Sequence, residues 1–216
     1  MSSLAPGLAD ILIRSRFTIL DILKERGYDT TPYQDISPSQ LVMLASGEQT
    51  LNIIVKKSDS ANPPPPCERA AVCYFINNAI RTRMDTFLRD FFDVNEKVTQ
   101  ADDILIILNE PYNEIFDKSS LLQWQNSKIR MRFFHIKQLV VNPSKHVLVP
   151  PHRKLTSEEA AEEIKRLHIK SKAQFPLIKH SDIQSRILGL VPGDLVEVLR
   201  PSPTAGIARV LRICVA

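Results

Sequence analysis

Apolar residues at helical spacing, together with one capping signal, predict four helices within residues 1–142. Residues 8–23 carry the first such stripe, and Gly27 follows as a stop signal. Residues 37–40 read Ser-Pro-Ser-Gln, a capping box with proline at the first helical position, which predicts a second, short helix. Residues 80–92 form a clean apolar stripe, and residues 113–124 also have a helical pattern.

Strand-like runs separate these predicted helices. They cover residues 51–55, 70–76, 104–108 and 129–136, and the third is continuously aliphatic, as expected of a buried strand. Residues 59–66 contain four consecutive prolines and are predicted to be an exposed loop. The order helix, strand, strand, helix, strand, helix, strand implies a small sheet with helices packed on it.

After residue 146 the signals for strands, helices and turns are short and closely spaced. Two consecutive prolines hold residues 146–152 extended, as a strand edge or an arm. Thr156 and Glu159 make a capping box that predicts a helix over residues 157–169. A second, short helical segment is expected further along the chain.

That short helical segment is marked at both ends. Ser181 and Gln184 repeat the capping-box spacing, and Gly189 stands where the glycine after a helix belongs. Residues 191–194, Val-Pro-Gly-Asp, have the chemistry of a type II turn.

Residues 195–199 and 207–215 have the pattern of two strands joined by a connection over residues 200–206. The predicted class is therefore α+β. We predict an N-terminal α/β domain over residues 1–142, and a small C-terminal module of helix and β-ribbon over residues 143–216.

Composition sets the wider limits. A chain of 216 residues suits one large domain or two small ones, and 44% hydrophobic residues is ordinary for a globular protein. No run approaches the roughly eighteen apolar residues of a membrane span. The N-terminus has no basic region followed by an apolar core, so no secretion signal is predicted. Cys67, Cys73 and Cys214 are odd in number and form no C-x-x-C pair, which predicts reduced thiols in an intracellular protein.

Charge is unevenly distributed. Residues 145–216 carry a net charge of +5 and residues 1–144 a net charge of −1. Several cations crowd the end of the predicted helix 157–169, where they suit the helix dipole: Lys165, Arg166, Lys170 and Lys172. This excess indicates a DNA-binding patch or, as the favoured interpretation, a solvated face or protein-docking surface.

Candidate catalytic or cofactor motifs are scarce. His146 and His152 lie on an extended segment whose spacing does not aim both rings at one metal, and no cysteine pair accompanies them. We expect both rings to make hydrogen bonds in a structural or docking role. No phosphate-binding, dinucleotide-binding or nucleophile-elbow motif is present, so we predict no metal and no cofactor.

The aromatic residues allow two interpretations. Trp124, the only tryptophan, lies on a predicted helix and is expected to pack in the core. Phe133 and Phe134, flanked by Arg130 and Arg132, have the composition of an RNA-binding surface. A buried strand with a polar outer face is the favoured alternative.

An ordered set of short motifs covers residues 146–216. It comprises H-x-L-V-P-x-H at 146–152, a capped helix, Pro-Leu-Ile at 176–178, Ser-Asp at 181–182, Gly-Leu at 189–190, Gly193, and R-P-S-x-T-A-G at 200–206. This set resembles the C-terminal module of the fifth common subunit of eukaryotic nuclear DNA-directed RNA polymerases I, II and III, which is similar to the H polypeptide of archaeal RNA polymerases. Ile183 and Pro203 depart from the family pattern, which usually has proline and glutamate there.

The resemblance implies a non-catalytic polymerase subunit in the nucleus, present in a multisubunit complex and not as a homo-oligomer. The C-terminal module would dock on the largest subunit, and the N-terminal domain would form a lower jaw near downstream duplex DNA. The implied docking residues are His146, Leu148, Val149, Pro150, His152, Arg200, Pro201, Ser202, Thr204, Ala205 and Gly206. Alternatively, some of these residues only shape a tight β-connection.

DNA contact by the jaw is expected to be weak and non-specific. The family carries a small polar loop with a lysine after the strand that corresponds to residues 104–108. Here the implied contacts are Asn113 and Lys118, among the carboxylates of Glu110, Glu114 and Asp117. Carboxylates repel phosphates, which limits the contact.

The N-terminal domain of the family resembles a nuclease in layout, which raises the question of catalysis. A metal-dependent nuclease needs an acidic residue and a neighbouring acid-x-Lys. The candidates are Asp102, Asp103 and Glu110, but Pro111 and Tyr112 follow Glu110, so the lysine is missing. We interpret the two aspartates as the solvated start of a strand. The alternatives to a polymerase subunit are a free-standing nucleic-acid or protein adaptor and an orphan nuclease.

Overall fold

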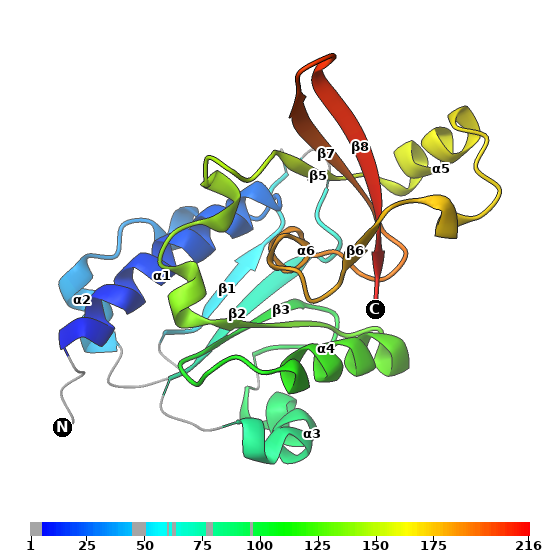
Figure 1. The fold of residues 1–216 in the computed structure, drawn as a ribbon. Coiled ribbons are helices and arrows are strands. Elements are labelled where there is room, and N and C mark those ends of the chain that lie inside the picture. Colours follow the sequence, from blue (N-terminus) through cyan, green and yellow to red (C-terminus); the bar gives the residue numbers. More distant parts are fainter. Residues whose placement is uncertain (1–5, 45–50, 60, 62–63, 77–79, 96) are drawn as a thin grey trace. The chain divides into compact units, whose positions relative to one another are not determined.

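The computed structural model of this chain describes residues 6–44, 51–59, 61, 64–76, 80–95 and 97–216 (Figure 1). It divides into two compact units, Met1–Val141 and Asn142–Ala216, called here the N-terminal and the C-terminal unit. The division lies one residue from the boundary predicted after residue 142. The roles given to the two predicted domains stay predictions. Among the described residues no helix is long and apolar enough to cross a membrane.

The N-terminal unit contains a mixed four-stranded sheet in the order β1-β2-β3-β4. The first pair is antiparallel and the other two pairs are parallel. The strands are β1 (Ile53–Lys56), β2 (Arg69–Phe75), β3 (Asp103–Leu108) and β4 (Arg130–His135).

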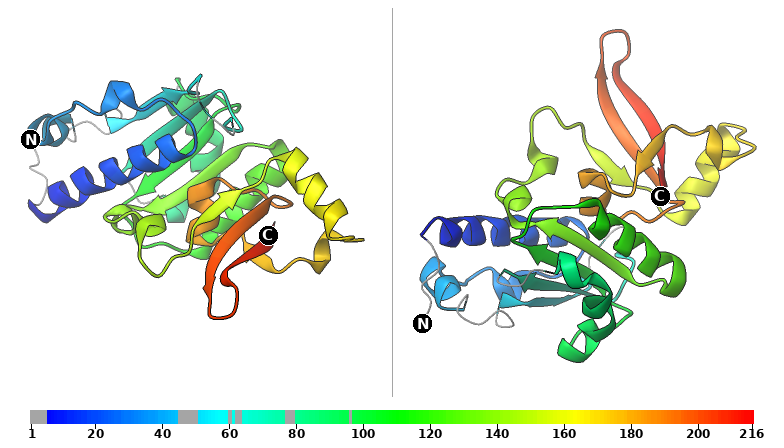
Figure 2. Two further views of the ribbon diagram at one scale, coloured as in Figure 1. Left: turned by 90° about the horizontal axis from the view of Figure 1, so that it is seen from above. Right: turned by 60° about the horizontal axis from the view of Figure 1, so that its bottom comes forward.

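Helices cover both faces of this sheet (Figures 1 and 2). Those after β2 and β3 connect parallel strands and lie on one face, while the first helix lies on the other. They are α1 (Pro6–Glu25), α2 (Pro38–Leu44), α3 (Met84–Val94) and α4 (Glu114–Ser127). Short 3-10 turns complete the unit: η1 (Thr31–Tyr33), η3 (Arg81–Arg83) and η4 (Ile136–Leu139).

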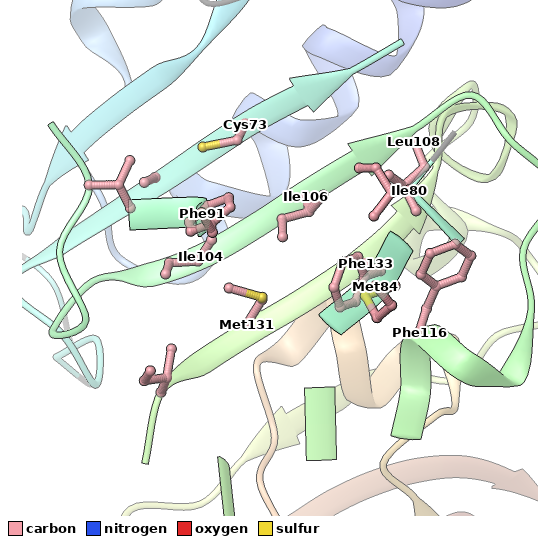
Figure 3. Close-up of a cluster of buried hydrophobic side chains, with 13 residues drawn as sticks. Cys73, Ile80, Met84, Phe91, Ile104, Ile106, Leu108, Phe116, Met131 and Phe133 are labelled. Carbon is pink, nitrogen blue, oxygen red and sulfur yellow. The ribbon is translucent and has the colours of Figure 1, made fainter. Parts of the chain in front are cut away.

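The core beneath α3 and α4 is aliphatic and aromatic (Figure 3). Ile106 lies on β3, and Phe91 of α3 and Phe116 of α4 belong to the same buried cluster. The rings of Phe116 and Phe133 lie 5.3 Å apart, centroid to centroid. Burial of this apolar area holds the helices on the sheet.

Most predicted elements of the N-terminal unit are confirmed. Ser37 and Gln40 make the capping box, with Gln40 N–H donating to Ser37 Oγ at 3.3 Å and Ser37 N–H to Gln40 Oε1 at 3.0 Å. The strand predicted at 51–55 is shifted and begins at Ile53, and the helix predicted from residue 80 begins with a 3-10 turn. In the predicted loop 59–66, residues 60, 62 and 63 lie outside the described residues.

Three expectations for the N-terminal unit are wrong. Asp102 and Asp103 are buried, not solvated. Burial does not alternate along β4, because Arg132, Phe133 and Phe134 are all almost completely buried. Both faces of this strand are covered by helices, which removes the expected polar outer face.

Trp124 is also placed differently from the prediction. It is only half-buried. Its ring lies under two cations, with Arg130 Cζ 4.9 Å and Lys128 Nζ 5.2 Å from the centroid. Cations over the face of an indole are attracted by its quadrupole, so the ring is held at the surface rather than in the core.

The C-terminal unit contains a second mixed sheet, in the order β5-β7-β8-β6. Leu195, Leu211 and Ile213 pack on one face under the first helix, while Val196 and Val198 pack on the other face. The elements are β5 (His152–Lys154), α5 (Ser157–Arg166), β6 (Leu177–Lys179), α6 (Ile183–Leu188), β7 (Leu195–Ser202) and β8 (Gly206–Val215), with 3-10 turns η5 (Pro143–Lys145) and η6 (Lys172–Gln174).

The α+β class is confirmed, but the C-terminal unit is more than a helix and a ribbon, because β5 and β6 complete a four-stranded sheet. The capping box of Thr156 and Glu159 is present, although α5 ends at Arg166 instead of residue 169. The N-cap of α6 is Asp182, not Ser181, and Gly189 ends that helix at φ 69° as predicted. The side chain of Asp182 accepts from Gln184 N–H at 2.8 Å.

Two further corrections concern the segments with the implied docking residues. Residues 146–149 form a turn instead of an extended arm, with Val149 N–H donating to the His146 carbonyl at 2.9 Å. The connection predicted over 200–206 is much shorter, because β7 and β8 remain paired up to Ser202 and Gly206.

Candidate docking surface

The hairpin of β7 and β8 is longer than the sheet that supports it (Figure 1). The two strands pair from Leu195 opposite Ile213 to Ser202 opposite Gly206. β5 pairs only with Val196–Val198, and β6 only with Ile213–Val215. Residues 199–209 therefore form a two-stranded ribbon without a neighbouring strand on either side; we call it the distal ribbon.

Local sequence shapes the tip of the distal ribbon. Ser202 Oγ lies 3.4 Å from Thr204 Oγ1 and accepts from Ala205 N–H at 3.3 Å. Gly206 has φ 69°, a conformation that other residues adopt only with strain. A Cβ at this position would meet no atom within 4 Å, so the backbone conformation, not space, requires glycine. These residues let the chain reverse within three positions.

The two faces of the distal ribbon differ. One face is apolar apart from Arg209, which lies opposite Leu199 and donates to Glu197 and Glu163; the other, called here the basic face, carries Arg200. Side chains at paired positions lie on the same face of a sheet. Pro201 pairs with Ile207, and Leu199 lies two residues away on that face. Ile207 is 69% exposed, which is unusual for a β-branched side chain. On the other face Arg200 pairs with Ala208.

The turn at 146–149 presents further apolar side chains. Val147 is 91% exposed and Leu148 82% exposed. His146 holds the turn through its Nδ1, which accepts from Leu148 N–H at 3.2 Å. The turn 146–149 and the distal ribbon, with residues 150–152, constitute what we call the docking surface.

His152 connects the two parts of the docking surface. It pairs with Val198, and Leu199 N–H donates to the Pro151 carbonyl at 3.0 Å, so residues 150–152 lie against the base of the ribbon. Its Nδ1 donates to the Pro150 carbonyl at 2.6 Å. Burial lowers the pKa of His152, as do the nearby charges of Arg200 and Arg212, and the Pro150 hydrogen bond and Asp182 oppose them only partly. Both histidines thus make hydrogen bonds, as expected.

A network of charges crosses the hairpin at the base of the distal ribbon. Glu197 accepts from Arg153 at 3.0 Å and from Arg209, and Arg209 also donates to Glu163 of α5 at 2.8 Å. Burial alone would raise the pKa of Glu197, but the two arginines outweigh it and keep the pKa below its usual value. Arg200 differs from these arginines, since its side chain makes no hydrogen bond or ion pair in the C-terminal unit, all of whose residues are described.

Comparison with known proteins identifies the family. A family model described as "RNA polymerase Rpb5, C-terminal domain" matches residues 141–214. The chain is 31% identical over 205 residues to the subunit rpabc1 of DNA-directed RNA polymerases I, II and III from Dictyostelium discoideum, which covers 94% of this chain and 97% of that protein. The chain belongs to the Rpb5 (RPABC1) family.

Archaeal members of the Rpb5 family match the C-terminal region alone. Subunit Rpo5 of Pyrococcus abyssi RNA polymerase is 46% identical over 74 residues, which is 34% of this chain and 89% of that protein. Subunit Rpo5 of Thermococcus kodakarensis is 51% identical over 61 residues, 28% of this chain and 73% of that protein. The family-model match over residues 141–214 contains the docking surface, whereas the match with the Dictyostelium relative covers 94% of the chain.

The implied docking residues fall into two groups in this Rpb5-family chain. Residues 150–152 and Arg200 lie beside each other, as described above. No hydrogen bond joins residues 146–149 to residues 200–206 within the C-terminal unit. Three apolar side chains of the docking surface are not among the implied docking residues: Val147, Leu199 and Ile207. Alternation along residues 195–201 was the signal that would have placed Leu199 beside Pro201 on one face.

The implied DNA contacts of the N-terminal unit have local partners. Asn113 is the N-cap of α4, and its side chain accepts from Ile115 N–H at 3.2 Å. Lys118 Nζ lies 3.6 Å from Glu114 Oε2 one turn earlier on the helix. Both side chains of that pair are well exposed, so the ion pair is weak and Lys118 can exchange it for another anion.

The carboxylates considered for a nuclease are committed to structural contacts. Asp102 binds Arg69 at 2.8 and 2.9 Å and accepts from Thr99 N–H at 2.8 Å. Glu110 Oε1 accepts from two main-chain N–H groups, those of Ile80 and Arg81, at 2.8 and 3.0 Å. Within the described residues no group of three or more His, Cys, Asp or Glu side chains is arranged to hold a metal.

Asp103 is at the centre of a buried charge cluster. It accepts from Arg26 at 2.7 Å and from Arg132 at 2.6 Å, and all three side chains are at most 5% exposed. Burial raises the pKa of Asp103, but the charges of Arg26, Arg132 and Arg130 outweigh this and lower the pKa overall. The carboxylate is therefore a permanent charge that ties α1 to β3 and β4, and not a free metal ligand.

Proposed function

We propose that this chain is a non-catalytic structural subunit of a nuclear DNA-directed RNA polymerase, and that its docking surface binds the largest subunit. The observation that carries the proposal is the membership of the Rpb5 family over nearly the whole chain. The R-P-S-x-T-A-G motif lies on an exposed ribbon, where a partner can reach it.

The chemistry of the docking surface supports a protein partner. Val147, Leu148 and Ile207 are all more than two-thirds exposed, and large exposed apolar side chains are typical of interaction sites. Arg200 has no partner within the C-terminal unit, and its planar guanidinium can donate two parallel hydrogen bonds to one carboxylate. A partner that covers these groups would gain both apolar burial and a charged pair.

The proposal for the N-terminal unit is a lower jaw near downstream duplex DNA. Its parallel β2, β3 and β4 with connecting helices support the nuclease-like layout that the family resemblance implies. Lys118 is exposed and can bind a phosphate, while Glu114 and Asp117 on the same helix repel it. Contact with DNA is thus weak and independent of base sequence.

Affinity purification of the tagged chain from its own cells, followed by mass spectrometry, tests this proposal. We expect stoichiometric recovery of the two large polymerase subunits, and the accompanying subunits identify which polymerase contains the chain. Recovery of the folded chain alone would support a free-standing adaptor and overturn the proposal.

Charge reversal tests the docking surface within the same experiment. We expect Arg200→Glu to reduce recovery of the largest subunit by at least about tenfold, because like charges across an interface are strongly unfavourable. Lys165→Glu, an equal change of charge on exposed α5, is the matched control and should leave recovery unchanged. Equal recovery with both variants would place the interface elsewhere.

A further inference from the structure

The two long edges of the distal ribbon are not equivalent. Leu199 N–H donates to the Pro151 carbonyl, outside the hairpin, so odd-numbered positions of β7 direct their main-chain groups away from β8. Position 201 shares this direction and is proline, which has no N–H. Proline on an edge strand prevents pairing with another strand. The β7 edge is therefore blocked by its own sequence.

The β8 edge is open. Ile213 N–H donates to the Pro176 carbonyl at 2.9 Å, so odd-numbered positions of β8 also face away from the hairpin. The main-chain N–H and C=O groups of Arg209 and Leu211 make no hydrogen bond in the C-terminal unit. β6 cannot extend to reach them, because its next donor would be residue 176, which is a proline. Arg209 and Leu211 thus present unused main-chain donors and acceptors, whereas Ile207 N–H already donates to the Ala205 carbonyl at 2.8 Å.

The side chains beside this open edge indicate what it binds. On the basic face, Arg200 has no partner, and the Nε atom of Arg212 is buried without a hydrogen bond. On the other face Ile207 is largely exposed, and Arg209 beside it already donates to Glu197 and Glu163. A strand placed against β8 would alternate its side chains between these two faces. A carboxylate on one side and an apolar residue on the next would complement the ribbon.

We propose that an extended, acidic segment of the largest polymerase subunit pairs with residues 207–211 of β8 and adds a strand to this sheet. The inference rests on the proposed function, and it specifies the mode of docking: main-chain hydrogen bonds supply affinity, while the charge and the apolar side chain set the register. A third strand also stabilises the distal ribbon, since an isolated two-stranded ribbon is marginally stable in water.

Hydrogen exchange at single residues tests the added strand. The full chain is labelled free and in the purified polymerase, and then read by fragmentation mass spectrometry. Amides of Ala208 and Val210, which face β7, should be protected in both samples. Amides of Arg209 and Leu211 should exchange rapidly in the free chain and at least about tenfold more slowly in the polymerase. Equal exchange of Arg209 and Leu211 in the two samples would overturn the proposal.

A pair of variants at one position tests the charge of the segment. Ala208 lies on the basic face of β8, outside the implied docking residues. We expect Ala208→Glu to lower recovery of the largest subunit at least about tenfold, and Ala208→Lys to leave it within about twofold. Equal losses of the largest subunit with Ala208→Glu and Ala208→Lys would show that no acidic segment lies beside position 208. A thermal melt of each variant shows whether the fold is retained.

The outcomes separate this inference from the proposed function. If the wild-type chain recovers no polymerase subunit, the proposed function fails. If it recovers them, but Arg209 and Leu211 gain no protection, the chain docks by side chains alone and only the added strand is excluded. Protection that disappears on nuclease treatment of the polymerase would assign the edge to nucleic acid and overturn the proposal.

Discussion

Two arginine–carboxylate clusters, one in each unit, use the same chemistry in opposite surroundings. In the N-terminal unit Asp103 binds Arg26 and Arg132, and these three side chains are at most 5% exposed. In the C-terminal unit Glu197 binds Arg153 and Arg209, which are 46% and 36% exposed. Water screens the second cluster but not the first, so the two differ in how much the fold depends on them.

This comparison shows that the burial of an ion pair decides how much the pair contributes to the stability of the fold. A buried charge that loses its partner cannot be resolvated, so breaking the Asp103 cluster leaves two arginines in an apolar interior. In the second cluster Glu197 is only 12% exposed, but Arg153 and Arg209 both reach water, so breaking one of these pairs costs less. The N-terminal unit thus depends on its charges for its core, while the C-terminal unit uses them at the surface, at the base of the distal ribbon.

The largest expected effect is that of Asp103→Asn. The amide cannot balance Arg26 and Arg132, and we expect a loss of about 3–5 kcal/mol in the free energy of unfolding. Trp124 lies in the N-terminal unit and is the only tryptophan, so denaturant titration followed by its fluorescence reports this loss. Asp10→Asn, which breaks an exposed pair with Arg14, is the control and should cost less than about 1 kcal/mol. Similar losses in the free energy of unfolding for both variants would contradict the difference between the buried and the exposed ion pairs.

Low pH should reduce the stability of the N-terminal unit, because it protonates the Asp103 carboxylate. The pKa of Asp103 is lowered in the folded state, so its contribution to stability is present above the unfolded pKa of about 3.9 and is lost as pH falls through the lower, folded pKa. Trp124 fluorescence measured in denaturant between pH 5 and about 2 should show this decline. In Asp103→Asn the decline should be shallower. An unchanged slope would mean that other carboxylates govern acid unfolding.

Glu197→Gln should have a smaller effect. Because its arginine partners are more than a third exposed, we expect a loss of roughly 1 kcal/mol or less, and a smaller loss in high salt. The C-terminal unit has no tryptophan or tyrosine, so hydrogen exchange of β7 and β8 amides is the suitable measurement. A loss as large as that of Asp103→Asn would contradict the assignment of this cluster to the screened surface.

The smallest effect on stability is expected for Ile207→Ser. Its side chain is 69% exposed and packs in neither core cluster, so the free energy of unfolding should change by no more than about 0.5 kcal/mol. Recovery of the largest polymerase subunit should nevertheless fall. Val94→Ser, at a 55% exposed position of the N-terminal unit, is the control. A fall in stability without a fall in recovery would make Ile207 a structural residue.

Local patterns predicted local structure well. The capping boxes of α2 and α5 depend on side chains three residues apart, so neighbouring residues alone decide them. Gly189 was predicted to end α6 for a similar reason, since its positive φ is a property of one residue. The N-cap was misplaced by one position because Ser181 and Asp182 can both cap, and only the packed position of the helix selects between them.

The misinterpreted residues depend on contacts that a local pattern does not show. Asp103 was interpreted as solvated because its two arginines lie 77 and 29 residues away in the chain. Trp124 was expected in the core, but the cations that hold its ring at the surface come from the following turn and strand. The docking surface was located from motifs, whereas the exposure of Val147 and Ile207 required the arrangement of the turn and the hairpin.

The sequence by itself determined the main helices and strands, the turn residues and the family, because each rests on short-range spacing or on an ordered set of motifs. It did not predict β5 and β6, which are three residues long. Tertiary structure alone decided which charges are buried and which strand edge is open. The reason is physical: burial and main-chain pairing depend on what other segments cover, and those segments lie far away in the sequence. Pro176 and Pro201 illustrate both contributions. Each proline can be read from the sequence, but only the folded sheet shows that Pro176 leaves the β8 edge open and that Pro201 blocks the β7 edge.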